Sequence, residues 1–333
     1  MSDDRQIDHV AVLGAGSWGT ALANVAARAG RKVTIWGREA GHIEAMAEAR
    51  ENIAYLPGIA LEKNVLLSND LQCVAGADAI LLVVPAQAQR DVAQSIRSLV
   101  QARVPVVVCA KGIERKTRQF MSEVVTEAIP DVPVAVLSGP SFAQDVAKRL
   151  PTAVTIASVY PGVAKKLADS LGTSTFRLYH SEDVRGVEIG GSAKNVLAIA
   201  CGIASGRGLG ASANAALVAR GFAELRRFGA AYGAQSETLM GLSGLGDLVL
   251  TCGSTQSRNF AFGLALGRGK SVAEAGGGKL AEGAFTTGVL VEMARERNVE
   301  VPICEAVNAL LIGNIDISSA IDSLLSRPQR SEN

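Results

Sequence analysis

The feature that most constrains the fold of this 333-residue chain is a glycine motif near its N-terminus. An apolar run, residues 9–13, leads directly into Gly14-Ala-Gly16-Ser-Trp-Gly19, and an alanine-rich segment follows at helical spacing over residues 20–29. A strand, a G-x-G-x-x-G turn and a helix in this order are typical of a dinucleotide-binding unit. In such a unit Gly14 makes the turn, Gly16 lets the backbone approach a pyrophosphate, and Gly19 packs the helix against the sheet. The alternative is a plain glycine-rich turn between a strand and a helix.

Short apolar runs and helix-like segments alternate through the first half of the chain. The helix-like segments include residues 89–99 and 117–129. The apolar runs have strand length and lie at residues 9–13, 33–36, 65–67, 79–84, 104–109 and 134–137, and residues 151–158 can add one more. This alternation is typical of a mostly parallel sheet that is covered by helices on both faces.

The second half of the chain has a different pattern. From about residue 181, alanine, leucine and charged residues recur at helical spacing, with few β-branched runs. The clearest such segments are residues 195–203, 213–232 and 289–297. We therefore predict an α/β chain with a Rossmann-like, doubly wound, mostly parallel sheet in an N-terminal domain, residues 1–180, and a second, all-α C-terminal domain, residues 181–333.

Composition excludes several classes of protein. Lys and Arg total 33 against 32 for Asp and Glu, and aromatic residues make up only 4%, which argues against a nucleic-acid partner. The N-terminus is polar and no uncharged apolar run reaches about 18 residues, so we expect no integral membrane segment. The five cysteines lack a Cys-x-x-Cys pair, which argues against a disulfide framework and a zinc site and favours a cytoplasmic location. Alanine- and glycine-rich helix faces leave a homodimer open.

The residues after the second apolar run bear on the choice between NADP and NAD. Trp36-Gly37-Arg38-Glu39 stands about where an NAD-preferring site has an acidic residue for the ribose hydroxyls. Arg38 can pair with a 2′-phosphate, which favours NADP, whereas Glu39 can accept a ribose hydroxyl, which favours NAD. A solvated Arg–Glu pair is the third alternative, and the cofactor is therefore predicted only as NADP or NAD.

Hydride chemistry on a secondary alcohol needs a group that exchanges a proton, and lysine is the better candidate here. The three histidines, His9, His42 and His180, lie where structural or solvated roles are expected. Lys111 follows the apolar run at 104–109, and Lys194 stands at the predicted start of a helix. If the two ammonium groups converge, repulsion and burial would let one of them exchange a proton near neutral pH. For either lysine taken alone, an ordinary surface charge is the better interpretation.

Three further motifs carry polar groups of suitable chemistry. Gly139-Pro-Ser141-Phe-Ala143 follows an apolar run and can border the nicotinamide and substrate, or be a simple turn. Asp247, in a glycine-rich turn, can orient the lysine, bind a substrate hydroxyl or cap a helix. Ser257-Arg258-Asn259 precedes a helix-like segment at 260–266, which suits a phosphate dianion, although a solvated cap has the same pattern.

Taken in order, these motifs resemble those of the NAD(P)-dependent glycerol-3-phosphate dehydrogenases of the bacterial type, over nearly the whole chain. The segments that carry the resemblance are residues 14–22, 55–58, 110–114, 137–143, 194–195, 244–248, 257–259 and 281–283. The resemblance implies reversible hydride transfer between NAD(P)H and dihydroxyacetone phosphate, which gives sn-glycerol 3-phosphate for glycerophospholipid synthesis.

The resemblance also implies roles for individual residues, with Lys194 as the proton donor and acceptor. The residues that it places at the substrate are Lys111, Gly139, Ser141, Lys194, Asp247, Ser257, Arg258 and Asn259. The residues expected at the cofactor, from the glycine motif and from the resemblance together, are Gly14, Gly16, Ser17, Trp18, Gly19, Arg38, Tyr55, Lys111, Ala143, Arg258, Leu280 and Glu282.

The chain departs from the family pattern in places, and two other functions stay open. Many members carry an acidic residue near Ser205 and an apolar one near Arg207, and some carry a second basic residue at Glu39. A β-hydroxyacid dehydrogenase shares the two domains and the catalytic lysine but takes a carboxylate substrate. A cofactor-sensing module would bind NAD(P) without turnover and would leave Ser257-Arg258-Asn259 without a role.

Overall fold

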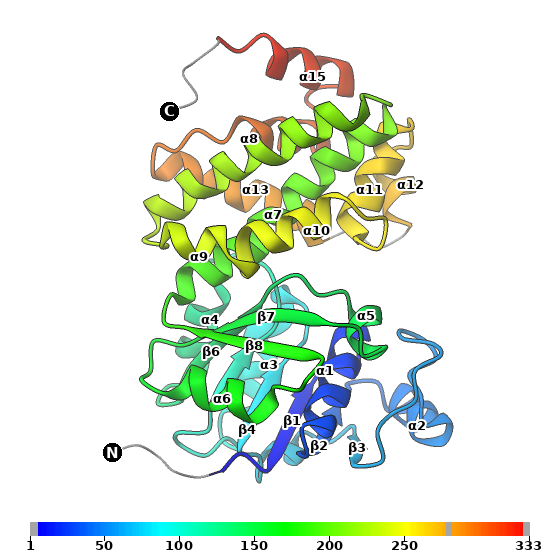
Figure 1. Cartoon of the computed structure of the whole chain (residues 1–333), viewed down its shortest axis with the longest axis vertical. Coiled ribbons are helices and arrows are strands. Elements are labelled where there is room, and N and C mark those ends of the chain that lie inside the picture. The colour runs from blue at the N-terminus through cyan, green and yellow to red at the C-terminus, as the bar shows by residue number, and fades with distance from the viewer. Residues whose placement is uncertain (1–5, 278–281, 329–333) are drawn as a thin grey trace. The chain divides into compact units, whose positions relative to one another are not determined.

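The computed structural model describes residues 6–277 and 282–328 (Figure 1). The chain divides into two compact units, Met1–Glu188 and Ile189–Asn333. The first contains every described strand, and the second is built from helices alone within its described residues.

The first unit is built on one eight-stranded sheet with the order β3-β2-β1-β4-β5-β6-β7-β8. Neighbouring strands are parallel except β6 and β7, so the prediction of a mostly parallel sheet is confirmed. The strands are β1 (His9–Leu13), β2 (Lys32–Trp36), β3 (Val65–Ser68), β4 (Ala79–Leu82), β5 (Val106–Val108), β6 (Val134–Ser138), β7 (Thr152–Ala157) and β8 (Phe176–Ser181). The sequence analysis missed β8, because this edge strand alternates with exposed polar side chains and has no apolar run.

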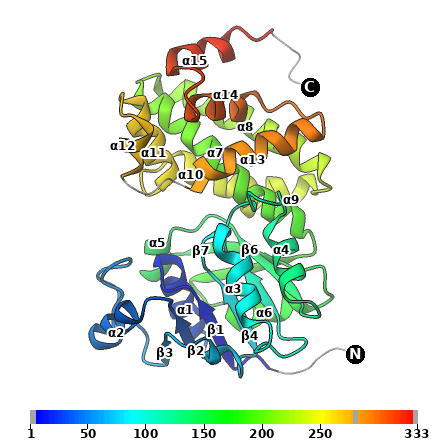
Figure 2. The ribbon, with the colours of Figure 1, turned by 180° about the vertical axis from the view of Figure 1, so that it is seen from behind.

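Helices bury both faces of the sheet, which explains why its strands are continuous apolar runs. Val10 and Val12 face a core with α1 (Ser17–Arg28), α5 (Ala143–Ala147) and α6 (Val163–Leu171). Ala11 and Leu13 face the opposite core, with α3 (Gln89–Ile96) and α4 (Met121–Ala128). Figure 2, seen from behind, shows α3 and α4 on this second face. Helix α2 (Ala40–Ala49) follows β2, and short 3-10 turns lie at Leu71–Val74 and Ala86–Ala88.

The second unit confirms the predicted all-α architecture. Its elements are α7 (Val184–Gly206), which begins in the last residues of the first unit, α8 (Gly210–Ala231), α9 (Ser236–Met240), a π-helical turn (Leu242–Gly246), α10 (Asp247–Cys252), α11 (Arg258–Gly267), α12 (Val272–Gly276), α13 (Glu282–Glu296), α14 (Pro302–Leu311) and α15 (Ile317–Leu325). All five cysteines of the chain carry free thiols.

Helix α7 is much longer than predicted, and Lys194 lies in its middle and not at a helix start. The sequence pattern placed a helix boundary among glycines, which normally weaken helices by about 1 kcal/mol each. Here the glycines let other backbones come close: a Cβ on Gly190 would lie 2.4 Å from the Ser243 carbonyl oxygen, and one on Gly202 would lie 2.2 Å from that of Phe260. Among the described helices, α7 alone is long and apolar enough to cross a membrane, and its apolar stretch is wholly buried in the protein.

Ser205 and Arg207, at and just after the C-terminal end of α7, make contacts within the helical unit. Ser205 Oγ accepts a hydrogen bond from Asn214 Nδ2 at 2.8 Å, and the Arg207 guanidinium donates to Ser318 Oγ at 2.9 Å.

Candidate active site

The glycine turn after β1 has the geometry of a dinucleotide-binding turn. Gly14 adopts φ 128° and lies so close to the segment after β4 that a Cβ would be 2.9 Å from the Val83 carbonyl group. A Cβ on Gly19 would lie 1.8 Å from the Gly14 oxygen, so only glycine allows α1 this close to the strand. Strand order reverses between β1 and β4, and ligands of doubly wound sheets bind outside the carboxyl ends of the strands at such a point.

Gly16 leaves space and unused donors at the start of α1. No atom lies within 4 Å of where its Cβ would be, and no side chain caps the helix. The backbone N–H groups of Gly16 and Ser17 donate to no described residue. Open space, free N–H groups and the positive end of a 12-residue helix together fit a pyrophosphate.

The segment around Tyr55 lies against this turn. Ser17 Oγ donates to the Tyr55 carbonyl oxygen at 2.7 Å. The Tyr55 ring is half exposed and meets His42 edge-on, with 5.2 Å between ring centroids. Trp18 is partly buried and packs against the core between the sheet and α1. Tyr55 therefore lies beside the glycine turn that contains Ser17 and Trp18, and the assignment of these three residues to a cofactor stays a prediction.

Arg38 and Glu39 form an exposed ion pair just after β2. Arg38 Nε lies 3.0 Å from Glu39 Oε1, and the side chains are 84% and 73% exposed. This is the solvated pair that the sequence left open. Both groups remain accessible, so the geometry does not choose between NADP and NAD.

Lys111, Gly139 and Ser141 come together after β5 and β6. Lys111 Nζ donates to the Gly139 carbonyl oxygen at 3.0 Å, and Ser141 Oγ donates to the same oxygen at 3.1 Å. Gly139 has φ 147°, and a Cβ there would lie 2.8 Å from Val154 Cα. Ala143 follows as the first residue of α5.

Arg90 of α3 and Gln87 of the preceding 3-10 turn hold the loop that follows Lys111. The Arg90 guanidinium donates to both carboxylate oxygens of Glu114, at 2.8 and 2.9 Å. This hydrogen bonding lowers the pKa of Glu114 despite its burial. Gln87 donates to the Ile113 carbonyl oxygen at 2.8 Å and accepts from the Arg115 N–H at 3.1 Å. The loop is therefore held just after Lys111, at residues 113–115.

In the second unit, Lys194 lies in a buried polar cluster with Asp247 and Thr251. Lys194 Nζ forms an ion pair with Asp247 Oδ1 and donates to Thr251 Oγ1 at 2.9 Å. The side chains of Lys194 and Asp247 are only 7% and 1% exposed. The prediction that Asp247 stands in a turn is wrong, because the glycines before it form a π-helical turn and Asp247 begins α10.

Thr251 is a polar neighbour of Lys194 that the sequence analysis did not identify. It lies four residues after Asp247 on α10, and its Oγ1 is 3.4 Å from Asp247 Oδ1. Residues four apart share one helix face, so the spacing would have indicated Thr251 if Asp247 had been assigned to a helix.

Ser257, Arg258 and Asn259 form the N-terminus of α11. Ser257 Oγ caps the helix by accepting the Phe260 N–H at 3.2 Å, and Asn259 Oδ1 accepts the Gly283 N–H at 2.9 Å. Arg258 is exposed and pairs with no described residue. The motif therefore supplies a helix cap and an accessible guanidinium, both of which favour an anion.

Close backbone contacts set the positions of these elements around Lys194. A Cβ on Gly263 of α11 would lie 2.1 Å from the Ile199 oxygen of α7, and one on Gly283 of α13 would lie 2.7 Å from the Asn195 oxygen. Glu282 is the first residue of α13, whereas Leu280 lies outside the described residues. Lys111 belongs to the first unit and Lys194 to the second, so their convergence stays a prediction.

Comparisons with known proteins agree along the chain. Residues 9–164 match the model of the NAD-dependent glycerol-3-phosphate dehydrogenase N-terminus, and residues 183–322 match that of the C-terminus. The chain is 61% identical to the NAD(P)+ glycerol-3-phosphate dehydrogenase of Azorhizobium caulinodans, over 98% of each protein, and 58% identical to that of Rhodopseudomonas palustris strain BisA53, over 98% of this chain and 99% of the relative.

Solved structures give the same result. The crystal structure of glycerol-3-phosphate dehydrogenase from Coxiella burnetii is 42% identical, with a TM-score of 0.92 over 96% of this chain and 99% of that one. The enzyme from Saccharomyces cerevisiae is 28% identical, with a TM-score of 0.84 over 96% and 99%. D-Mandelate dehydrogenase, at 15% identity and a TM-score of 0.62 over 92% and 98%, shares only the fold.

Proposed function

Because this chain belongs to the NAD(P)-dependent glycerol-3-phosphate dehydrogenases, a family of oxidoreductases, we propose that it interconverts dihydroxyacetone phosphate and sn-glycerol 3-phosphate with Lys194 as the proton donor and acceptor. The observation that carries the role of Lys194 is its burial in contact with Asp247 and Thr251. The glycerol 3-phosphate formed supplies glycerophospholipid synthesis.

The chemistry assigned to the chain's own residues is proton transfer and charge stabilisation. A reduced nicotinamide bound through the glycine turn would supply the hydride for the C2 carbonyl carbon of dihydroxyacetone phosphate. Lys194 Nζ donates a proton to the carbonyl oxygen, and in the reverse direction it takes the hydroxyl proton. Asp247 stabilises the ammonium form, and Thr251 Oγ1 fixes its direction by accepting an N–H.

The phosphate of the substrate is assigned to the N-terminus of α11. Arg258 offers an accessible guanidinium there, and Ser257 and Asn259 flank it with polar side chains. A guanidinium and a helix N-terminus both favour a phosphate dianion. The remaining substrate contacts are assigned to Lys111, Gly139 and Ser141.

We assign the cofactor mainly to the N-terminal domain, residues 1–180, and the substrate mainly to the helical domain, residues 181–333. The fit of the glycine turn to a pyrophosphate supports the first assignment. Cofactor contacts are assigned to Gly14, Gly16, Ser17, Trp18, Gly19, Arg38, Tyr55, Lys111 and Ala143, and in the helical domain to Arg258, Leu280 and Glu282.

The test is nicotinamide oxidation by the purified protein, followed by absorbance, with NADPH or NADH. We expect turnover with dihydroxyacetone phosphate and none with unphosphorylated dihydroxyacetone, because the Arg258 site needs the phosphate. Activity on a 3-hydroxy acid instead would favour a hydroxyacid dehydrogenase, and nucleotide binding without turnover would favour a sensor.

The same assay resolves the cofactor preference. If Arg38 binds a 2′-phosphate, Arg38→Ala raises the KM for NADPH about tenfold or more and leaves that for NADH unchanged. Glu39→Ala is the matched variant: if Glu39 binds the ribose hydroxyls, it raises the KM for NADH instead. Equal effects of each change on both nucleotides would show that the pair is only solvated.

We also infer a cytoplasmic location and a possible homodimer through the helical unit. Five free thiols in one chain suit a reducing compartment. Light scattering after size-exclusion chromatography distinguishes a mass of about 34.5 kDa from one of twice that value.

A further inference from the structure

Asn52 is a fully buried amide that contacts the glycine turn from a distant segment. It follows α2 and lies 36 residues after Gly16 in the sequence. Its Nδ2 donates to the Ala15 carbonyl oxygen at 3.0 Å and to Thr20 Oγ1 at 2.8 Å, while its Oδ1 accepts the Tyr55 N–H at 3.2 Å. A buried amide is costly unless it is hydrogen-bonded, so these three contacts hold Asn52 and the turn together.

These contacts decide which way two backbone N–H groups point. In a trans peptide the C=O and the following N–H point in opposite directions. Asn52, together with His42 Nε2 at 3.2 Å, holds the Ala15 oxygen, and this turns the Gly16 N–H to the opposite side. Thr20 Oγ1 accepts from Asn52 and, together with the Thr20 N–H, donates to the Gly16 oxygen at 2.9 Å, which turns the Ser17 N–H away in the same manner.

We propose that Asn52 is a positioning residue for the cofactor, which orients the Gly16 and Ser17 N–H groups toward a pyrophosphate. The inference rests on the proposed function, because it takes the glycine turn as the dinucleotide site. A carbonyl oxygen rotated into that site would repel a phosphate, and free rotation of the turn would have to be lost on binding. Asn52 removes both costs before the nucleotide arrives, so its loss weakens nucleotide affinity and leaves proton transfer at Lys194 untouched.

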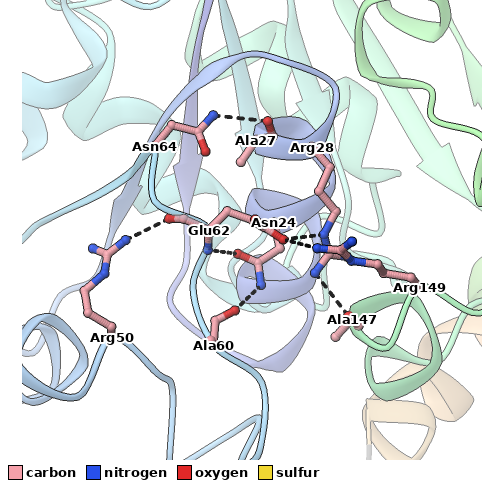
Figure 3. A network of polar contacts seen from close by, with 9 residues as sticks. All are labelled: Asn24, Ala27, Arg28, Arg50, Ala60, Glu62, Asn64, Ala147 and Arg149. Carbon is pink, nitrogen blue, oxygen red and sulfur yellow. Dashed lines mark hydrogen bonds and ion pairs between the residues drawn. The ribbon is translucent and has the colours of Figure 1, made fainter.

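Asn24 of α1 offers a matched control, because it holds residues 60–62 of the segment that follows Asn52 (Figure 3). Asn24 of α1 is also fully buried; its Nδ2 donates to the Ala60 oxygen at 3.0 Å and its Oδ1 accepts the Glu62 N–H at 3.0 Å. Glu62 is held in turn by Arg28 at 2.6 Å and Arg149 at 3.0 Å. These contacts fasten the segment to α1 one helical turn beyond Thr20, without touching the Ala15 or Gly16 carbonyl groups.

The experiment compares Asn52→Ala, Asn52→Asp and Asn24→Ala with the wild-type chain. NADPH affinity is measured by fluorescence titration, and Tm is measured without nucleotide. We expect Asn52→Ala to raise the Kd about tenfold and Asn52→Asp about 100-fold, because a carboxylate cannot donate to Ala15 and repels the phosphates. Asn24→Ala lowers Tm as Asn52→Ala does, but changes the Kd by no more than about twofold. At saturating NADPH, kcat of both alanine variants stays near wild type.

Each outcome decides the question. An unchanged Kd in both Asn52 variants, or an equal loss of affinity in Asn24→Ala, overturns the inference. If Asn52→Ala does not fold, the Kd of Asn52→Asp tests the inference instead, since aspartate has the same size as asparagine and keeps the acceptor for the Tyr55 N–H. If the wild-type chain binds neither NADPH nor NADH, the proposed cofactor site itself is wrong; if it binds them, only the role of Asn52 is in question.

Discussion

At the scale of single residues, the buried pair of Lys194 and Asp247 is explained better by a role in proton transfer than by a contribution to the stability of the fold. The desolvation of two charges offsets most of their attraction, so a buried ion pair adds little to the free energy of folding. We expect Lys194→Ala to lower kcat by a factor of about 100 to 10,000, the usual loss when a general acid is removed. Its Kd for NADPH should stay at the wild-type value.

Controls separate catalysis from folding in this prediction. Lys165→Ala removes an exposed ion pair with Asp169 on α6 and should change neither kcat nor Tm appreciably. Asp247→Asn should lower kcat and also destabilise the fold by about 3–5 kcal/mol, because it leaves the Lys194 ammonium buried without its counter-charge. Near-normal turnover of Lys194→Ala would remove this lysine from the mechanism.

Sequence patterns identified Lys194 and Asp247 and gave a contact between them as one alternative, but they did not identify Thr251 as the third member of the cluster. Lys194 and Asp247 were identified from the order of the motifs. Thr251 can be identified only once Asp247 is known to lie in a helix, because residues four apart share one helix face. Asn52 carried no signal of its own, because a buried asparagine that holds a distant carbonyl group differs in no sequence property from a solvated one. Contacts between segments far apart in the chain are set by tertiary packing, which local patterns do not contain.

At the scale of elements, glycines in α7 and α11 determine how these two helices of the second unit pack. Gly202 and Gly206 of α7 meet Gly263 and Gly267 of α11 at backbone contact distance. We expect Gly263→Ala to lower the free energy of unfolding by about 1–3 kcal/mol, because the added Cβ would overlap the Ile199 carbonyl group and push the helices apart. Urea unfolding at equilibrium measures this change.

Gly41→Ala is the control for a glycine that lies in a helix without a close neighbour. No atom lies within 4 Å of where its Cβ would be in α2, so alanine should stabilise the protein by about 0.5–1 kcal/mol. Because α11 begins with Arg258, Gly263→Ala should also raise the KM for dihydroxyacetone phosphate. A neutral effect on both stability and KM would contradict the close approach of the two helices.

Gly190 and Gly191 explain why the start of α7 was predicted wrongly. Glycine runs usually end helices, so α7 was expected to begin near residue 195, whereas it begins at Val184. Strand β8 was not predicted because its side chains are mostly exposed and form no apolar run. Its pairing with β7 makes it a strand. The other strands were predictable because a sheet covered on both faces needs continuous apolar runs.

At the scale of the whole molecule, each unit contains a buried carboxyl group that binds protons near neutral pH. Burial raises the pKa of Glu188 to about 7, although the Ser122 N–H and hydroxyl donate to it. Burial likewise raises the pKa of Glu224 to about 7, where it accepts the N–H groups of Ile303 and Cys304 at the start of α14. Both values lie above the ordinary glutamate value of 4.5.

These shifts make stability depend on pH between about 4.5 and 7. In this window the folded chain keeps both protons while the unfolded chain has lost them, so the free energy of unfolding falls as pH rises and is lowest above about 7. Each group contributes up to about 3 kcal/mol across the window. Glu62 and Glu114 have lowered pKa values, so their stabilisation is lost only as the pH falls below about 4.5, outside this window.

Urea unfolding at pH 5.5 and 8.0 tests this prediction, with the wild-type chain more stable at pH 5.5. Glu224→Gln keeps an acceptor for the Ile303 N–H but cannot ionise, so the difference between the two pH values should shrink by about half. Glu44→Gln, on an exposed position of α2, should leave the difference unchanged. A wild-type chain that gains stability from pH 5.5 to 8.0 would mean that both carboxyl groups are ionised in the fold, and that their hydrogen bonds outweigh the cost of burial.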